Sequence, residues 1–259
     1  MKIAVLTMED PLYLPRVFDR LLRVRAGDIA CVCACQPIYK DYTTFSMALR
    51  YRRAFGTWNL AQLAFRRGWA KLAGIARWGE SKGRFRTIKR VCAAHAVRYE
   101  EPRDVNDPAF LDHLRTLGVD LIVSITCPQI FQDALIQLPI KGCLNMHGAK
   151  LPEYRGLLPS FWMLADGVEE AGVTIFQVTE KLDVGMIVGQ STFPIRDPRS
   201  LHEFIIESKE HVADLLIEVL DAVEDDSVER RPMKGKGSYR GWPTRADYRR
   251  FRSRGLRVW

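Results

Sequence analysis

Hydrophobic and polar positions fall into blocks along the chain that predict a regular succession of strands and helices. Short apolar runs at 2–7 and 28–35 have the length and composition of buried parallel strands. Between them, 14–24 places apolar residues at helical spacing. A strand, a helix and a strand at this spacing predict a βαβ unit, and therefore a sheet with parallel strands.

The same alternation resumes after a long aromatic and basic segment. The pattern predicts helices over about 84–95, 107–117, 159–165 and 198–223, and strands over about 97–99, 120–125, 141–147, 172–178 and 186–193. We therefore predict an α/β fold with an open, mostly parallel Rossmann-like sheet, a helical insertion and a short irregular C-terminal extension. In such sheets ligands collect at the carboxyl ends of the strands.

The length of 259 residues suits one large domain or two small ones, because domains cluster at roughly 100–200 residues. We expect one α/β domain over 1–225, with the basic aromatic insertion at 40–95, and a basic extension over 226–259. The composition, 47% apolar and 27% charged, is that of a globular protein with a sizeable core.

Cysteine usage and the N-terminus favour a reduced, cytoplasmic protein. The six cysteines show no CxxC spacing, and Cys31, Cys33 and Cys35 alternate as strand residues do. We interpret them as core residues and expect no metal. The start of the chain lacks the apolar region of a signal peptide, and no apolar run approaches the ~18–20 residues that a membrane span requires.

The net charge of +8 is concentrated in two segments. Residues 50–90 contain twelve basic residues and one acidic residue, and residues 230–257 contain eleven and one. Such segments suit nucleic acid, an anionic membrane or a phosphorylated substrate, or are simply solvated helix faces. Because 46–78 interleaves aromatic residues with arginines, segment 46–90 is a candidate for peripheral membrane contact, and a helical subdomain packed on the sheet is the alternative. We expect no specific nucleic-acid complex.

Asn145 and His147 end the predicted strand over 141–147. Side chains on a strand alternate faces, so these two project to one side and Met146 to the other. An amide and an imidazole on one face can hold and protonate a carbonyl oxygen. Taken alone, the pair equally fits a hydrogen-bonded structural histidine.

The residues that follow this pair extend the pattern. A Leu-Pro-Glu-Tyr-Arg-Gly turn occupies 151–156, Gly-Val-Thr lies at 172–174 and Leu-Asp-Val-Gly lies at 182–185. With Asn145-Met146-His147, these elements resemble the folate-dependent formyltransferase family, which includes methionyl-tRNA formyltransferase, glycinamide ribonucleotide transformylase and the sugar N-formyltransferases. The resemblance implies a sheet of the formyltransferase type, 10-formyltetrahydrofolate as donor, no metal, and an amine as acceptor.

The resemblance is clear over about 118–195 and implies catalytic roles for three residues. Asn145 is implied to donate its amide N–H to the oxyanion of the tetrahedral intermediate. His147 is implied to stabilise that oxyanion and shuttle a proton, and Asp183 to orient or charge the imidazole. Donors held where charge develops typically contribute ~10²–10³ in rate each. Outside the family pattern, Asp183 is a turn residue between two strands.

The resemblance places the pteridine against backbone groups in two loops, one after the strand over 120–125 and one over 178–183. The candidate cofactor contacts are Cys127, Gln129, Ile130, Val178 and Lys181. For Phe131 in the first loop, core packing is the preferred interpretation.

For the acceptor site, we select an arginine and three aromatic residues. These candidates are Arg155, Tyr154, Trp162 and Trp242. Arg155 equally suits a turn arginine bonded to carbonyl groups. The loop after the first strand contains Glu9 and Asp10. Anion sites bind phosphate through backbone N–H groups, and two carboxylates would repel it, so this loop is a poor phosphate site.

These observations together favour a formyltransferase that acts on a small amine. We expect a nucleotide-linked amino sugar for surface polysaccharide, or a lipid-linked one. Family members that formylate the initiator tRNA resemble one another in having a folded C-terminal domain. The 36 residues after about 223 are too few and too polar to form such a domain. The alternatives are a methionyl-tRNA formyltransferase-like enzyme, a formyltetrahydrofolate hydrolase and a non-catalytic polyanion-binding protein. The oligomeric state stays open, with a homodimer as one option.

Overall fold

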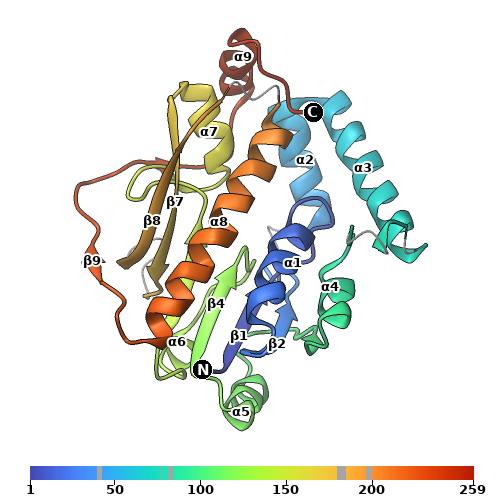
Figure 1. Cartoon of the computed structure of the whole chain (residues 1–259). Helices are drawn as coiled ribbons and strands as arrows, with labels where there is room; N and C mark the ends of the chain where they lie inside the picture. The colour runs from blue at the N-terminus through green and yellow to red at the C-terminus, as the bar shows by residue number, and fades with distance from the viewer. Residues whose placement is uncertain (40–42, 77, 81–83, 180–184, 197–199) are drawn as a thin grey trace.

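The computed structural model describes residues 1–39, 43–76, 78–80, 84–179, 185–196 and 200–259, and within them helices cover both faces of a central sheet (Figure 1). The strand order is β3-β2-β1-β4-β5-β7-β8-β9. The first five pair in parallel and are β3 (Tyr99–Glu100), β2 (Ile29–Ala34), β1 (Ile3–Thr7), β4 (Leu121–Ile125) and β5 (Cys143–His147). The last three pair antiparallel and are β7 (Glu170–Gln177), β8 (Met186–Pro194) and β9 (Arg231–Pro232). The predicted open, mostly parallel α/β fold is confirmed.

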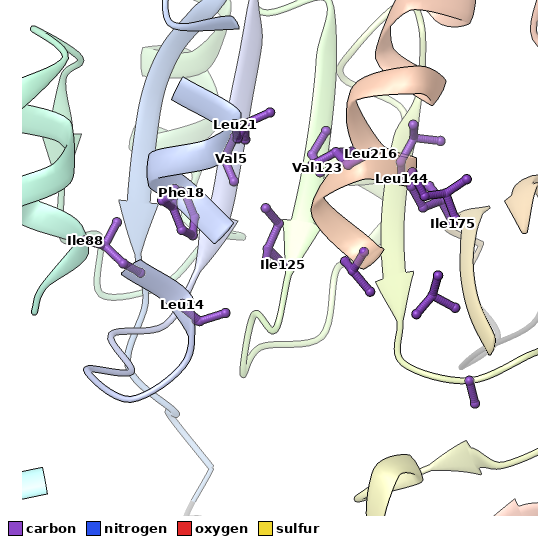
Figure 2. Packing of buried hydrophobic residues seen from close by; sticks show 14 of the residues in the cluster. Val5, Leu14, Phe18, Leu21, Ile88, Val123, Ile125, Leu144, Ile175 and Leu216 are labelled. Carbon is purple, nitrogen blue, oxygen red and sulfur yellow. The ribbon is translucent and has the colours of Figure 1, made fainter. Parts of the chain in front are cut away.

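Strand alternation divides the core into two layers. One layer lies under α1 (Leu14–Arg25), α4 (Ile88–Ala94) and α8 (Leu201–Glu224), and the other under α5 (Pro108–Leu117) and α6 (Asp133–Ile136). Val5 and Val123 point into the first layer, where they meet Phe18 of α1 and Leu216 of α8 (Figure 2). Leu6 and Ile122 point into the second layer. Because both faces are covered, the central strands are mostly apolar.

The helices begin where local sequence satisfies their first N–H groups. The Ser200 hydroxyl caps α8 by accepting from the Glu203 N–H, and the Asp107 carboxylate caps α5 by accepting from the Ala109 N–H. Gly118 ends α5 in the left-handed region at φ 68°, a conformation that glycine adopts without steric cost.

The basic aromatic insertion forms two helices, α2 (Thr44–Phe55) and α3 (Thr57–Ile75), before α4. Phe55 makes edge-on ring contacts with Phe161 and Tyr248, so α2 is anchored to the body of the molecule. Figure 1 shows α3 at the outer edge of the molecule, outside the layer of α1 and α8. No helix in the described part of the chain is both long enough and apolar enough to cross a bilayer.

The C-terminal extension is more regular than expected. Its β10 (Tyr239–Arg240) pairs in parallel with β6 (Arg155–Gly156) as a separate two-stranded sheet. The next helix, α9 (Arg245–Ser253), buries Phe251 fully against the ring of Phe161 in α7 (Pro159–Asp166). The extension therefore folds back over the segment that follows the Asn145–His147 strand.

Phe18 tests how far the packing of α1 against the sheet stabilises the fold. Its side chain is fully buried, whereas Val24 on the same helix is exposed. We expect Phe18→Ala to lower the free energy of unfolding by about 3–5 kcal/mol, because it leaves a cavity. Val24→Ala is the matched control and should stay within about 0.5 kcal/mol of the starting protein in urea unfolding. Equal losses in the two variants would contradict this account of the core.

Candidate active site

Asn145 and His147 lie on one face of the carboxyl end of β5. Asn145 pairs in register with Ser124 of β4, and His147 with Thr174 of β7. The neighbouring Met146 packs toward the layer under α1 and α8, so the two polar side chains point the other way. Asn145 is half-buried, and its side-chain amide has no hydrogen bond to any described residue. The predicted pairing on one face is therefore present.

The imidazole of His147 is buried and held by a backbone carbonyl. Its Nε2 lies 2.8 Å from the carbonyl oxygen of Tyr154. A carbonyl can only accept, so Nε2 carries a proton. The Tyr154 carbonyl thus holds the orientation of the imidazole ring.

The position of that carbonyl depends on the C-terminal extension. Tyr154 has a left-handed φ of 56°, which a bulky residue adopts only when its surroundings hold it there. Its N–H donates to the Ser238 hydroxyl at 2.8 Å, and the next N–H, of Arg155, donates to the Ser238 carbonyl at 2.9 Å. Gly156 has φ 94°, and a Cβ there would collide with the carbonyl oxygen of Arg240. Ser238 was not selected from the sequence, because only this distant strand pairing shows its role.

A second set of hydrogen bonds fixes the start of the same turn. The hydroxyl of Thr174 is fully buried; it donates to the Ala149 carbonyl at 2.7 Å and accepts from the Leu151 N–H at 3.0 Å. The amide of Gln190 donates to this hydroxyl at 2.9 Å and to the Leu151 carbonyl at 3.0 Å. Thr174, which sequence analysis named only as part of the Gly-Val-Thr motif, therefore shapes the turn between β5 and β6.

The four candidate acceptor residues come together at the junction of β6, α7 and β10. Arg155 donates to the Lys236 carbonyl at 2.9 Å, and the buried Trp162 donates through Nε1 to the Gly241 carbonyl at 3.1 Å. The half-buried Trp242 has a buried Nε1 without a hydrogen-bond partner among the described residues. The carbonyl-bonded alternative for Arg155 is thus present in this structure.

Tyr154 completes this junction through its side chain. Burial raises the pKa of its hydroxyl, and a hydrogen bond to Asp166 raises it further. The guanidinium of Arg240 lies 5.8 Å from the Tyr154 ring and 5.0 Å from the Trp162 ring, and pairs with Asp166 at 2.7 Å. These contacts brace the extension against α7, and Arg240 is a further residue that local sequence did not indicate.

The loop after β4, which contains Cys127, Gln129 and Ile130, is held by the side chain of Gln129. The Gln129 side chain accepts from the Val105 N–H at 2.9 Å and donates to the carbonyls of Gln36 and Arg103, at 2.6 and 2.9 Å. Its amide therefore connects three chain segments and leaves the loop backbone as the part that can face a ligand. Lys181 and Asp183 lie outside the described residues.

The other three cofactor candidates differ in exposure. Ile130 is 61% exposed, and its N–H donates to the Tyr39 hydroxyl at 3.0 Å. The half-buried Cys127 is hydrogen-bonded to Cys35, which lowers the pKa of Cys127 and raises that of Cys35. Val178 donates its N–H to the Cys143 carbonyl at 2.7 Å. Phe131 is buried in the core, as expected.

One cation at this edge of the sheet was not selected from the sequence. Lys209 of α8 donates to the Thr126 hydroxyl, at the end of β4, at 3.2 Å. Burial lowers the pKa of Lys209, and the nearby carboxylate of Asp10 opposes that shift. Helical spacing alone could not separate Lys209 from the solvated charges of α8.

The acidic loop after β1 is committed to structural contacts. The Glu9 carboxylate accepts from the N–H groups of Ile88 and Lys89, at 3.2 and 3.1 Å, and so caps α4. Asp10 accepts from the Leu12 N–H at 3.0 Å and lies 3.9 Å from Arg67 of α3. This loop therefore presents carboxylates where an anion site would need N–H groups.

One group of described residues has the spacing of metal ligands. Cys31, Cys33 and Glu100 place a ligand atom each within 4.8 Å of one another at the β2–β3 edge of the sheet. The hydrogen bond with Cys31, and burial, raise the pKa of Cys33. Neither strand contributes to the Asn145–His147 pair, and we assign the group no catalytic role.

Solved structures with the same fold include enzymes of two substrate classes. A glycinamide ribonucleotide transformylase from Symbiobacterium toebii is 16% identical with a TM-score of 0.60, covering 90% of this chain and 94% of its own. A sugar N-formyltransferase from a Shewanella species is 20% identical with a TM-score of 0.57, covering 93% and 76%. A Helicobacter canadensis N-formyltransferase, in complex with folinic acid and dTDP-3-aminofucose, is 12% identical with a TM-score of 0.58, covering 93% and 71%.

The sequence itself shows the family. The family model described as formyl transferase matches residues 75–220, more than half of the chain, and contains β4, β5, the turn at 151–156 and β7. With the Asn145–His147 pair inside that match and the same fold in solved formyltransferases, this chain belongs to the formyl transferase family.

Proposed function

We propose that this protein transfers a formyl group from 10-formyltetrahydrofolate to the primary amine of a small acceptor, a nucleotide-linked amino sugar. The observation that carries the proposal is the pairing of Asn145 and His147 on one face of β5, with the imidazole held by the Tyr154 carbonyl. Family membership supports the formyl chemistry, because the matched region contains this pair.

The geometry divides the chemical work between the two side chains. The acceptor nitrogen bonds to the formyl carbon, and the carbonyl oxygen becomes an oxyanion to which the Asn145 amide N–H donates. The bond from carbon to the folate nitrogen then breaks, and that nitrogen must gain the proton that the amine loses. We assign this proton exchange to the His147 imidazole, which the Tyr154 carbonyl holds through Nε2. Asp183 keeps its proposed role of orienting or charging the ring.

One observation disfavours glycinamide ribonucleotide as the acceptor, and one similar structure is consistent with an amino sugar. The loop after β1 commits Glu9 to capping α4 and places Asp10 beside Arg67, so it offers carboxylates and not a phosphate cradle. Among the similar structures, the Helicobacter canadensis enzyme is in complex with folinic acid and dTDP-3-aminofucose. The donor and acceptor classes of this proposal match those two ligands.

The acceptor is tested by offering the donor with different amines. We expect formylation of nucleotide-linked amino sugars, followed by mass spectrometry, with little product from glycinamide ribonucleotide or charged initiator tRNA. A reaction without any amine serves as the control. Rapid release of formate there would favour a hydrolase, and efficient formylation of the tRNA alone would overturn the acceptor assignment.

The proton-transfer role is tested at His147. We expect His147→Asn to lower turnover by about 10²-fold or more with folate affinity nearly unchanged, because a positioned acid–base group is lost. His113→Asn is the control, since His113 bonds to Glu100 outside this site, and should keep near-normal turnover. A His147→Asn variant with more than about half of the original rate would be incompatible with the assignment.

Asp183→Asn should also be severely impaired, and a normal rate there would leave Asp183 as a turn residue.

The orienting role of the extension is tested at Ser238. Removing the hydroxyl with Ser238→Ala takes away the bond to the Tyr154 N–H, so we expect kcat to fall about tenfold with KM nearly constant. Ser238→Thr keeps the oxygen and should restore kcat. Full kcat in Ser238→Ala would show that the Tyr154 carbonyl is held without this bond, and equal losses in both variants would indicate a packing effect only.

A further inference from the structure

Large apolar side chains are exposed together on the insertion. Of the described residues, the strongly exposed ones in this region are Phe45, Trp58, Phe65, Trp69, Leu72, Ile75 and Trp78. Trp58 is 74% exposed and Phe65 is 73% exposed. Such a concentration of exposed large apolar residues in one segment is typical of a contact with a partner or a membrane.

The polarity of α3 is the reverse of that of an ordinary surface helix. At about 100° per residue, Trp58, Phe65, Trp69 and Leu72 fall within an arc of about 60°, and all four are exposed. We call these four residues the outer face of α3. The buried residues of α3 are the small Ala70, Ala73 and Gly74. A helix that served only to cover the protein core would place its large apolar residues inward.

The charges around this face select an anionic surface. The helices α2 and α3 contain six basic residues, Arg50, Arg52, Arg53, Arg66, Arg67 and Lys71, and no acidic residue. At the same spacing Arg66 lies about 60° beyond one edge of the arc and Lys71 about 100° beyond the other, and both are exposed. Apolar and aromatic residues bordered by Lys and Arg are the pattern of helices that lie in a membrane interface. A second copy would bring like charges together, so charge complementarity favours anionic lipid.

A pocket next to the outer face suits a phosphate-bearing headgroup. It has a volume of about 470 Å³ and is lined in part by Phe65, Arg66 and Trp69 of α3 and by Arg16 and Arg86. The Nε of Arg86 is buried without a hydrogen-bond partner among the described residues. The loop after β1 also lines this pocket through Pro11 and Leu12, which places it at the carboxyl edge of the sheet.

We propose that α3 docks the protein on the surface of an anionic membrane, with the outer face in the lipid interface and phosphate headgroups at the arginines of the pocket. The helix lies along the membrane plane, and Trp58, Phe65, Trp69 and Leu72 enter the boundary between headgroups and acyl chains. The docking rests on the exposure and charge of α3, independently of the proposed function. Combined with that function, it presents a membrane-attached amine acceptor to the edge of the sheet that carries Asn145 and His147.

The experiment is co-sedimentation of the full chain with vesicles. We expect binding to phosphatidylcholine mixed with phosphatidylglycerol, little binding to phosphatidylcholine alone, and weaker binding at high salt. The double variant Trp58→Glu with Leu72→Glu should bind at least about tenfold more weakly, because apolar burial is replaced by charge repulsion. Ile140→Glu is the matched control: Ile140 is 85% exposed outside the insertion, so the change should alter vesicle binding little.

Two further measurements keep the outcome decisive. Trp58 and Leu72 do not line the pocket, so formylation of a soluble acceptor should be unchanged in the double variant, which also shows that it is folded. No binding of the starting protein to anionic vesicles, or equal binding by the double variant, would overturn the proposal. Sedimentation equilibrium provides the last comparison. If the starting protein forms a dimer but does not bind vesicles, and the double variant is monomeric, the outer face is a contact between two copies and the proposal is wrong. Failure of formyl transfer with intact vesicle binding would count against the proposed function alone.

Discussion

The hydrogen bond from His147 to the carbonyl of Tyr154 joins the two halves of the site. On one side stands β5, whose position is fixed by parallel pairing with β4 and antiparallel pairing with β7. On the other side stands a turn with left-handed backbone, which has its own hydrogen bonds to Ser238 and a glycine that lets β10 approach. Neither half alone determines the orientation of the imidazole. The fold therefore brings the end of β5 and the distant segment around Ser238 together at the imidazole of His147.

The sequence predicted what depends on local pattern. The strand and helix order followed from apolar blocks, and the shared face of Asn145 and His147 followed from strand alternation, because both are set within a few residues. The Tyr154–Ser238 bond could not be predicted, since 84 residues separate the partners. Gln129 is similar: its amide bonds to residues near 36 and 103–105, and nothing in the surrounding sequence indicates either contact.

The insertion shows a different limit of sequence patterns. The sequence shows the apolar residues of α3 but not which face of the helix packs inward. That face is the one whose small residues let the helix approach the rest of the protein closely. Gly74, for example, lies beside Arg86 and Thr87. The contacts of Glu9 with the start of α4 and of Asp10 with Arg67 then tie this basic unit to the loop after β1. Glu9 and Asp10 thus balance part of the positive charge of the insertion. They also make the end of β1 unsuitable for binding an anion.

The parallel pairing of β10 with β6 has a consequence for biosynthesis. Residues 239–240 contact 155–156, so the turn that orients the imidazole stays incomplete while the ribosome is still adding the segment after α8. Contacts between such distant segments also form late in folding, because closing a long loop must precede them. A nascent chain with its central sheet already assembled would hold Asn145 in place before His147 is aligned. The alignment of His147 therefore depends on a segment that is made long after the strand that carries it.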